Sequence, residues 1–191
     1  MLAADSGNVE QVKALIAAGS AVNEKQSSGR MEGFTALIYA AYDGRLDCVK
    51  ALIASKADVN LADSLGSTPL YEATVAGRVD CIKALIAAGA DVNVHGALGS
   101  TALMNAAVYG RVDCVKILIA AGAQLNAKDS DGKTALMHSA SWDNADCLKV
   151  LIAAGADLNA KDKASDTALT IAERNDTKDC VKILKAAGAR H

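Results

Sequence analysis

A motif of the form Gly-x-Thr-(Ala/Pro)-Leu returns at a constant interval of 33 residues along the chain. Its copies begin at Gly33, Gly66, Gly99 and Gly132, and Ser165 stands in the fifth position. A cysteine keeps the same interval, at Cys48, Cys81, Cys114, Cys147 and Cys180. A fixed period of this length is typical of stacked arrays, in which each repeat buries its apolar face against its neighbours.

The segment 66–93 shows how one repeat folds. Thr68 offers a hydroxyl to cap a helix, and Pro69 suits the first helical position, where its missing N–H costs nothing. The pattern predicts a short Ala-rich helix ending at Gly77, then a second helix that opens near Asp80 and stops at Gly89. Two helices this short are unstable alone in water, so their apolar faces must pack against neighbouring repeats.

The Thr-Pro-Leu opening, the inter-helix Gly77, the apolar second helix and the Gly-Ala-Asp-Val-Asn ending at Asn93 resemble the ankyrin repeat over nearly the whole chain. The resemblance implies an all-α solenoid of stacked helix-turn-helix repeats with hairpin-like loops. The family usually carries His after Thr-Pro-Leu. Those positions here are Ile38, Tyr71, Met104, Met137 and Thr170. We expect apolar packing to replace the hydrogen bonds of that His.

We expect a single domain over residues 1–191. Its predicted repeats are 1–23 (incomplete), 24–60, 61–93, 94–126, 127–159 and 160–191, the last acting as a C-terminal cap. Gln11 replaces the cysteine in the first repeat, which indicates that the cysteines face the preceding repeat. The second repeat carries an insertion within 24–33, which is either a functional loop or a tolerated change.

Bulk composition excludes several classes of function. The chain is 51% hydrophobic with a formal net charge of −2, so it is folded and lacks the basic stripe that nucleic-acid or membrane-surface binding requires. No targeting segment is recognisable. We therefore expect a cytoplasmic monomer without nucleic-acid or membrane partners and without a cofactor.

No catalytic or metal-binding constellation is recognisable either. Cysteines at a periodic helical position are expected to be small buried hydrophobes, because stacked helices hold equivalent positions too far apart for a disulfide. His95, His138 and His191 are scattered along the chain. We therefore expect neither a metal site nor an enzyme.

The six aromatic residues are the informative ones. The resemblance implies that the hairpin tips and the outer side of each first helix line a concave, partner-binding surface, which would hold five of them and leave only Tyr71 elsewhere. The predicted partner-binding residues are Phe34, Tyr39, Tyr42, Glu72, Val75, Asn105, Val108, Tyr109, His138 and Trp142. The predicted function is a non-enzymatic scaffold that binds a partner protein. The alternative is a structural module from a larger multidomain protein with no binding role of its own.

A second periodic set comprises Arg45, Arg78 and Arg111. It suits either an acidic partner or the free carbonyls at the end of the first helices.

Overall fold

Threonine side chains start the first helix of the repeats. In the computed structural model, which describes residues 7–27 and 32–191, Thr68 caps its helix by accepting a hydrogen bond from the backbone N–H of Tyr71, and Pro69 is the first helical residue. The same cap recurs at Thr35, Thr101, Thr134 and Thr167. The helices so capped, here called first-row helices, are α3 (Ala36–Asp43), α5 (Pro69–Val75), α7 (Ala102–Val108), α9 (Ala135–Ser141) and α11 (Ala168–Arg174).

The second helix of each repeat is longer and follows a tight turn. These second-row helices are α2 (Val9–Ala17), α4 (Leu46–Ala54), α6 (Val79–Ala87), α8 (Val112–Ala120), α10 (Ala145–Ala153) and α12 (Lys178–Ala186). A 3₁₀ turn, η1, spans Ala97–Gly99. Among the described residues all regular structure is helical, which confirms the predicted all-α repeat fold.

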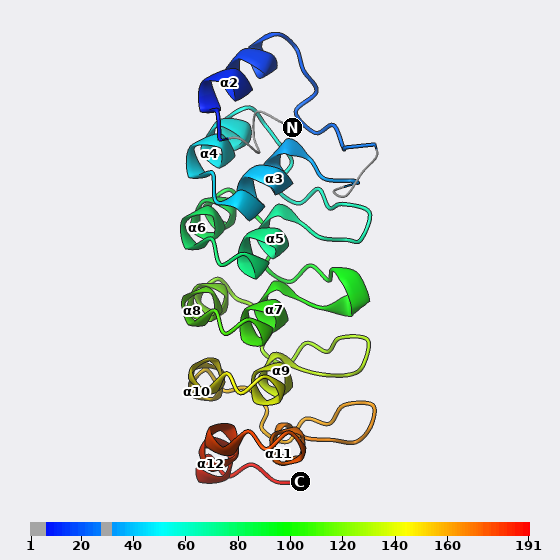
Figure 1. The fold of residues 1–191 in the computed structure, drawn as a ribbon, viewed down its shortest axis with the longest axis vertical. Helices are drawn as coiled ribbons and strands as arrows, with labels where there is room; N and C mark the ends of the chain where they lie inside the picture. Colours follow the sequence, from blue (N-terminus) through cyan, green and yellow to red (C-terminus); the bar gives the residue numbers. More distant parts are fainter. Residues whose placement is uncertain (1–6, 28–31) are drawn as a thin grey trace. The chain divides into compact units, whose positions relative to one another are not determined.

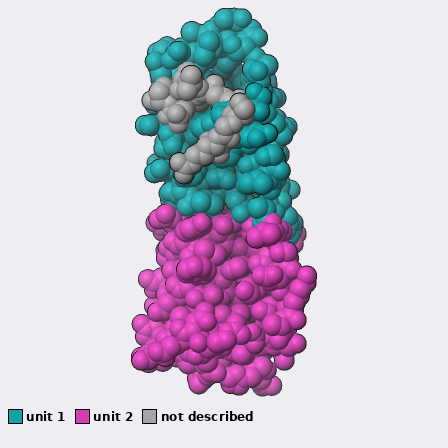
Figure 2. Space-filling model, turned by 45° about the vertical axis from the view of Figure 1, so that its right-hand side comes forward, with its two compact units in different colours: residues 1–97 teal, residues 98–191 magenta. Residues whose placement is uncertain are grey.

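The chain forms two compact units, unit 1 at Met1–Ala97 and unit 2 at Leu98–His191 (Figure 2). In unit 1, α3 packs against α5, while α4 packs against α2 and α6. In unit 2, α7, α9 and α11 form one layer and α8, α10 and α12 the other (Figure 1). The loops that precede α9 and α11 extend from the first-row side. The repeat boundaries and the single-domain assignment stay predictions.

The cysteines belong to the core between repeats. All five are free thiols and buried. The thiol of Cys147 donates to the carbonyl of Ala106 at 3.9 Å, and that of Cys180 donates to Ser139 at the same distance. Both acceptors lie in the preceding repeat, so the predicted orientation of these cysteines is confirmed.

Residues that directly precede second-row helices tie them to the preceding repeat in both units. Arg78 Nε donates to the carbonyl of Tyr42 at 2.9 Å. In unit 2, Asn144 Nδ2 donates to the carbonyls of Ala107 and Val108, each at 2.8 Å. These carbonyls end first-row helices and have no intrahelical partner. For Arg78, the structural interpretation of the arginine set is therefore confirmed.

Methionine closes two of the helix caps. Met104 and Met137 are 1% exposed, and the sulfur of each accepts a hydrogen bond at 3.4 Å from the backbone N–H of the capping threonine, Thr101 or Thr134. Thioether sulfur is a weak acceptor. In these two repeats, apolar burial with one weak hydrogen bond thus fills the position that follows Thr-Ala-Leu, whereas the Thr170 hydroxyl lies 3.2 Å from that of Thr167.

Candidate functional site

The first-row side of unit 1 carries three of the predicted aromatic residues, and one of them is buried. Phe34 is only 7% exposed, so the expectation that its ring lies on free surface is wrong. The backbone carbonyl of Phe34 accepts a hydrogen bond from the N–H of Gln26 at 2.9 Å, which folds the loop over this residue. The ring meets that of Tyr39 edge to face, with centroids 5.2 Å apart.

Tyr39 and Tyr42 are half-buried. The hydroxyl of Tyr39 donates to Gln26 Oε1 at 2.7 Å, so this ring supports the loop of its own repeat. Gln26 belongs to the predicted insertion 24–33, of which residues 28–31 lie outside the described part of the chain. These contacts give Phe34 and Tyr39 a structural role.

Glu72 and Val75 lie on α5 and are also half-buried. Burial raises the pKa of the Glu72 carboxyl above its usual value, a hydrogen bond from Ser67 lowers it, and the carboxylate of Asp63 raises it. Asp63 is itself occupied, because its Oδ1 accepts from the backbone N–H groups of Leu65 and Ser67 at 2.8 Å. Glu72 is thus a carboxyl in a partly desolvated, acidic setting.

Unit 2 presents the two most exposed aromatic rings of the described chain. Tyr109 is 52% exposed and Trp142 is 64% exposed. Tyr109 is the C-cap residue of α7 and Trp142 is the C-cap residue of α9, and these two helices pack against each other. Both rings are exposed, as their shared repeat position predicts. We call Tyr109 and Trp142 the aromatic patch.

His138 connects the side of α9 to the preceding loop. Its Nε2 lies 2.8 Å from Oδ2 of Asp129, and both side chains are mostly buried. The other oxygen of Asp129 accepts the backbone N–H groups of Asp131 and Lys133 at 2.9 Å. The ring of His138 therefore has one nitrogen committed to holding the loop.

Asn105 and Val108 of α7 are half-buried. The amide of Asn105 donates to the backbone carbonyl of Thr101 at 3.1 Å, and the carbonyl of Val108 accepts from Asn144. The predicted orienting role of Asn105 rests on its side-chain oxygen and its second amide N–H, because one N–H is already used by Thr101.

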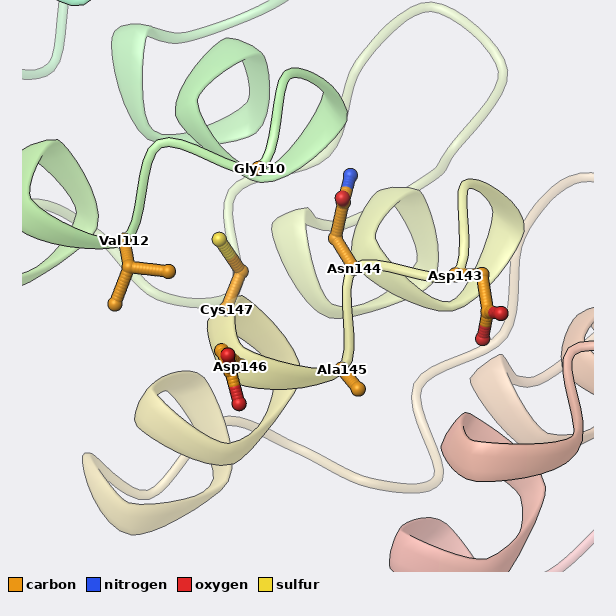
Figure 3. A pocket seen from close by; sticks show the side chains of 7 residues that line it. All are labelled: Gly110, Val112, Asp143, Asn144, Ala145, Asp146 and Cys147. Atoms are coloured by element: carbon orange, nitrogen blue, oxygen red, sulfur yellow. The ribbon is translucent and has the colours of Figure 1, made fainter.

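A crevice of about 220 Å³ lies between the turns before α8 and α10 (Figure 3). In Figure 3 the side chains of Asn144 and Cys147 point toward the preceding repeat, whereas that of Asp143 points away. Burial and the Asp146 carboxylate raise the pKa of the Cys147 thiol to about 11. This thiol is a poor nucleophile at neutral pH, because only the thiolate attacks.

A similar hollow of about 350 Å³ in unit 1 is lined by Gly7, Gly44 and Cys48. Because both hollows open at the same turn of the repeat, they follow from the packing of successive turns. Within residues 7–27 and 32–191, no three His, Cys, Asp or Glu side chains gather as a metal site would require.

A family model described as "Ankyrin repeats (3 copies)" matches residues 1–96 and 88–162. The chain belongs to the ankyrin-repeat family. Ankyrin repeats are generally non-catalytic modules for protein–protein interaction. A search of curated proteins found no match.

This ankyrin-repeat protein also exposes residues that the sequence analysis did not single out. Leu65 is 67% exposed in unit 1, and Leu98 is 80% exposed in unit 2. Each directly precedes the glycine of a Gly-Ser-Thr motif, at a position where Asp131 and Ala164 stand in later repeats. A leucine at a polar loop position was the signal available in the sequence. No helix in the described ranges of this ankyrin-repeat protein is both long enough and apolar enough to cross a bilayer.

Proposed function

We propose that the chain binds a partner protein on the exposed side of its first-row helices, with the aromatic patch of unit 2 as the main anchor. The observation that carries this proposal is the exposure of Trp142 and Tyr109, at 64% and 52%, in the same position of adjacent repeats. Tyrosine and tryptophan dominate the binding energy of protein interfaces, and exposed aromatic rings on a folded surface commonly mark such interfaces.

The backbone beneath both rings is fixed before binding. The N–H of Tyr109 donates to the carbonyl of Asn105 at 2.9 Å, and the N–H of Trp142 donates to that of His138 at 3.2 Å. The packing of α7 against α9 fixes the two helix ends relative to each other. Little conformational entropy is then lost from the backbone on binding, which favours affinity.

The remaining predicted residues have smaller roles in this proposal. His138 and Asn105 border the aromatic patch and supply polar atoms that orient the partner. Tyr39, Tyr42, Glu72 and Val75 offer half-buried contacts on unit 1. Phe34 is excluded, because a buried ring has no area left to give a partner.

The test compares three immobilised proteins: wild type, the double variant Tyr109→Ala/Trp142→Ala, and Lys149→Ala. Lys149 is an exposed residue of α10 in the same unit, so it controls for a surface change outside the first row. We expect a purified candidate partner to bind wild type and Lys149→Ala alike, and the double variant at least tenfold more weakly.

Thermal unfolding of the three proteins should nearly coincide, because neither ring contributes a buried core contact. If the double variant keeps every partner of the wild type at equal affinity, the aromatic patch has no binding role. The array is then a structural module.

A further inference from the structure

We propose that Glu72 and Asp63 of unit 1 together bind an arginine side chain of the partner protein. This inference rests on the proposed function and names one chemical group of that partner. It concerns unit 1 alone. Two observations carry it: one carboxylate oxygen of Asp63 has no hydrogen-bond partner among the described residues, and the corresponding oxygen in unit 2 is paired with His138.

Asp63 and Asp129 hold the loops before α5 and α9 in the same way. In each, Oδ1 accepts the backbone N–H groups of the residues two and four positions further on, at 2.8 Å for Asp63 and 2.9 Å for Asp129. Because the same two hydrogen bonds orient both carboxylates, the second oxygen of each faces the same repeat position of the first-row helix that follows.

That repeat position lies nine residues after the aspartate, and the two units fill it differently. In unit 2 it is His138, whose Nε2 lies 2.8 Å from Oδ2 of Asp129. In unit 1 it is Glu72, and an ionised carboxylate only accepts hydrogen bonds. Unit 1 therefore has two carboxyl groups where unit 2 pairs a carboxylate with a nitrogen donor.

The second oxygen of Asp63 is unsatisfied but within reach of a ligand. Asp63 is only 9% exposed, and its Oδ2 has no hydrogen-bond partner in the described part of the chain. Every fully buried side-chain nitrogen or oxygen of the described residues is hydrogen-bonded, so this oxygen must touch the surface. Neither Asp63 nor Glu72 forms an ion pair with a described residue. The protein thus leaves this acceptor to a group from outside.

The two carboxyl groups act on each other. Burial raises the pKa of Glu72, a hydrogen bond from Ser67 lowers it, and the Asp63 carboxylate raises it. A cation placed between the two carboxylates would remove their repulsion and favour the charged form of both. The charged pair is therefore unfavourable by itself and favourable around a cation.

A guanidinium group suits this pair better than a metal ion does. Its planar fork of N–H donors forms parallel hydrogen bonds to carboxylate oxygens, so it can bridge two acceptors. Calcium and magnesium ions need about six or more oxygen ligands. Within residues 7–27 and 32–191, no three His, Cys, Asp or Glu side chains gather to supply them. The cation that fits is therefore an arginine side chain.

The loops that follow lack the second carboxyl group. At the same spacing, Gly96 precedes Asn105 and Asp162 precedes Ile171. Asp162 also accepts the backbone N–H groups two and four positions further on, at 2.9 Å. It therefore provides a matched control, because it has the same loop contacts beside an apolar residue.

The probe is a blocked tripeptide with arginine between two glycines, added at low salt to the whole, isotope-labelled chain. The control peptide carries citrulline, which has the shape of arginine without its charge. By NMR, the backbone amides of Leu65 and Ser67 report on the site because they donate to Asp63. We expect these two amides to shift saturably with the arginine peptide, and at least tenfold weaker binding of the citrulline peptide.

Charge-removing variants assign the binding to the two carboxyl groups. Glu72→Gln keeps the shape of the side chain and should weaken binding of the arginine peptide at least tenfold. Asp63→Asn keeps the oxygen that accepts the two backbone N–H groups and should weaken binding severalfold. Asp162→Asn is the control and should bind the peptide as wild type does.

Exchanging the arrangements of the two units is a further test. Glu72→His gives unit 1 the pairing of unit 2, so the imidazole should donate to Asp63 and close the site to arginine. His138→Glu gives unit 2 the two carboxyl groups of unit 1. The amides of Asp131 and Lys133, which do not respond in wild type, should then shift with the arginine peptide. The amide spectrum of each variant also shows whether it is folded.

The inference is wrong if both peptides bind equally, if Glu72→Gln binds as wild type does, or if no arginine-dependent shift appears. It is also wrong if magnesium chloride shifts the same amides at a lower concentration than the arginine peptide, since the site would then take a metal ion. If the peptide fails while a partner protein still requires the aromatic patch of unit 2, the proposed function stands. If partner binding is also independent of the patch, both proposals are wrong.

Discussion

The imidazole Nε2 of His138 lies 2.8 Å from the carboxylate Oδ2 of Asp129, which joins the side of α9 to the loop that precedes it. Because the same carboxylate also accepts two backbone N–H groups of that loop, one aspartate organises the turn and anchors it to the helix. The loop that precedes α9 is thereby tied to that helix through a side-chain hydrogen bond.

Removal of this anchor should loosen the loop. We expect His138→Ala to lower the free energy of unfolding by about 1–2 kcal/mol, because a largely buried charge-assisted hydrogen bond is lost. The amides of Asp131 and Lys133 should exchange with deuterium faster, since their acceptor loses its support. Ser130→Ala, at an exposed position of the same loop, is the control. Unchanged exchange at both amides would show that the loop keeps its conformation without the hydrogen bond from His138.

Glu72 should make stability depend on pH. Its pKa is raised in the folded state, so the native protein holds this proton more firmly than the unfolded chain does. Below the ordinary value of 4.5 the carboxyl is protonated in both states and has no effect. As pH rises above that value, the folded state loses stability. Glu72→Gln should therefore be more stable than wild type near neutral pH.

Urea unfolding of wild type and Glu72→Gln in acid and at neutral pH measures this difference, which should disappear in acid. Glu10→Gln, at an exposed position of α2, should show no such gain at neutral pH. A Glu72→Gln variant that is less stable than wild type at neutral pH would mean that the charged carboxylate is stabilising.

Asn144 should contribute to stability through the two carbonyls that it caps. We expect Asn144→Ala to cost about 1–3 kcal/mol, because both acceptors at the end of α7 lose their donor. Lys149→Ala removes only an exposed ion pair with Asp146 and should change stability by less than about 0.5 kcal/mol. Denaturant unfolding compares the two. Equal effects would show that water replaces the amide without loss.

Lys56 is held in a strained backbone conformation. Its φ is 65°, at a repeat position where Gly19, Gly89 and Gly122 have φ of 87–89°. We expect Lys56→Gly to raise the free energy of unfolding by about 1 kcal/mol, because a side chain in the left-handed region is unfavourable. Lys50→Gly, within α4, should instead lower it by about 1 kcal/mol. A destabilised Lys56→Gly would mean that the lysine side chain makes a compensating contact.

The fold was largely predictable because each local feature, such as a helix cap or a glycine stop, recurs every 33 residues, and the recurrence makes a weak local prediction reliable. Thr68 followed by Pro69 predicts a capped helix on its own, and the structure contains that cap. The replacement of the periodic cysteine by Gln11 predicted which way the cysteines face, and Cys147 contacts the preceding repeat as expected. Both predictions depend on local sequence or on register, which a periodic chain makes visible.

The site was less predictable because exposure depends on contacts between segments. Phe34 occupies a hairpin-tip position in the sequence, but a backbone bond to Gln26 folds the loop over it and its ring packs on Tyr39. The pairing of His138 with Asp129 joins residues nine positions apart across a turn, and neither periodicity nor composition indicates it. Loop contacts thus bury or support residues that the sequence placed on the free surface, Phe34 in unit 1 and His138 in unit 2.

The repeated order of residues along this chain determined its helices, its family and the side on which its cysteines lie, because helix caps, apolar periodicity and glycine stops act over a few residues. Only the tertiary structure decided which aromatic rings are free to meet a partner. A ring is exposed only where neither a loop nor a neighbouring helix packs against it. The rings of Trp142 and Tyr109 are exposed, and that of Phe34 is buried.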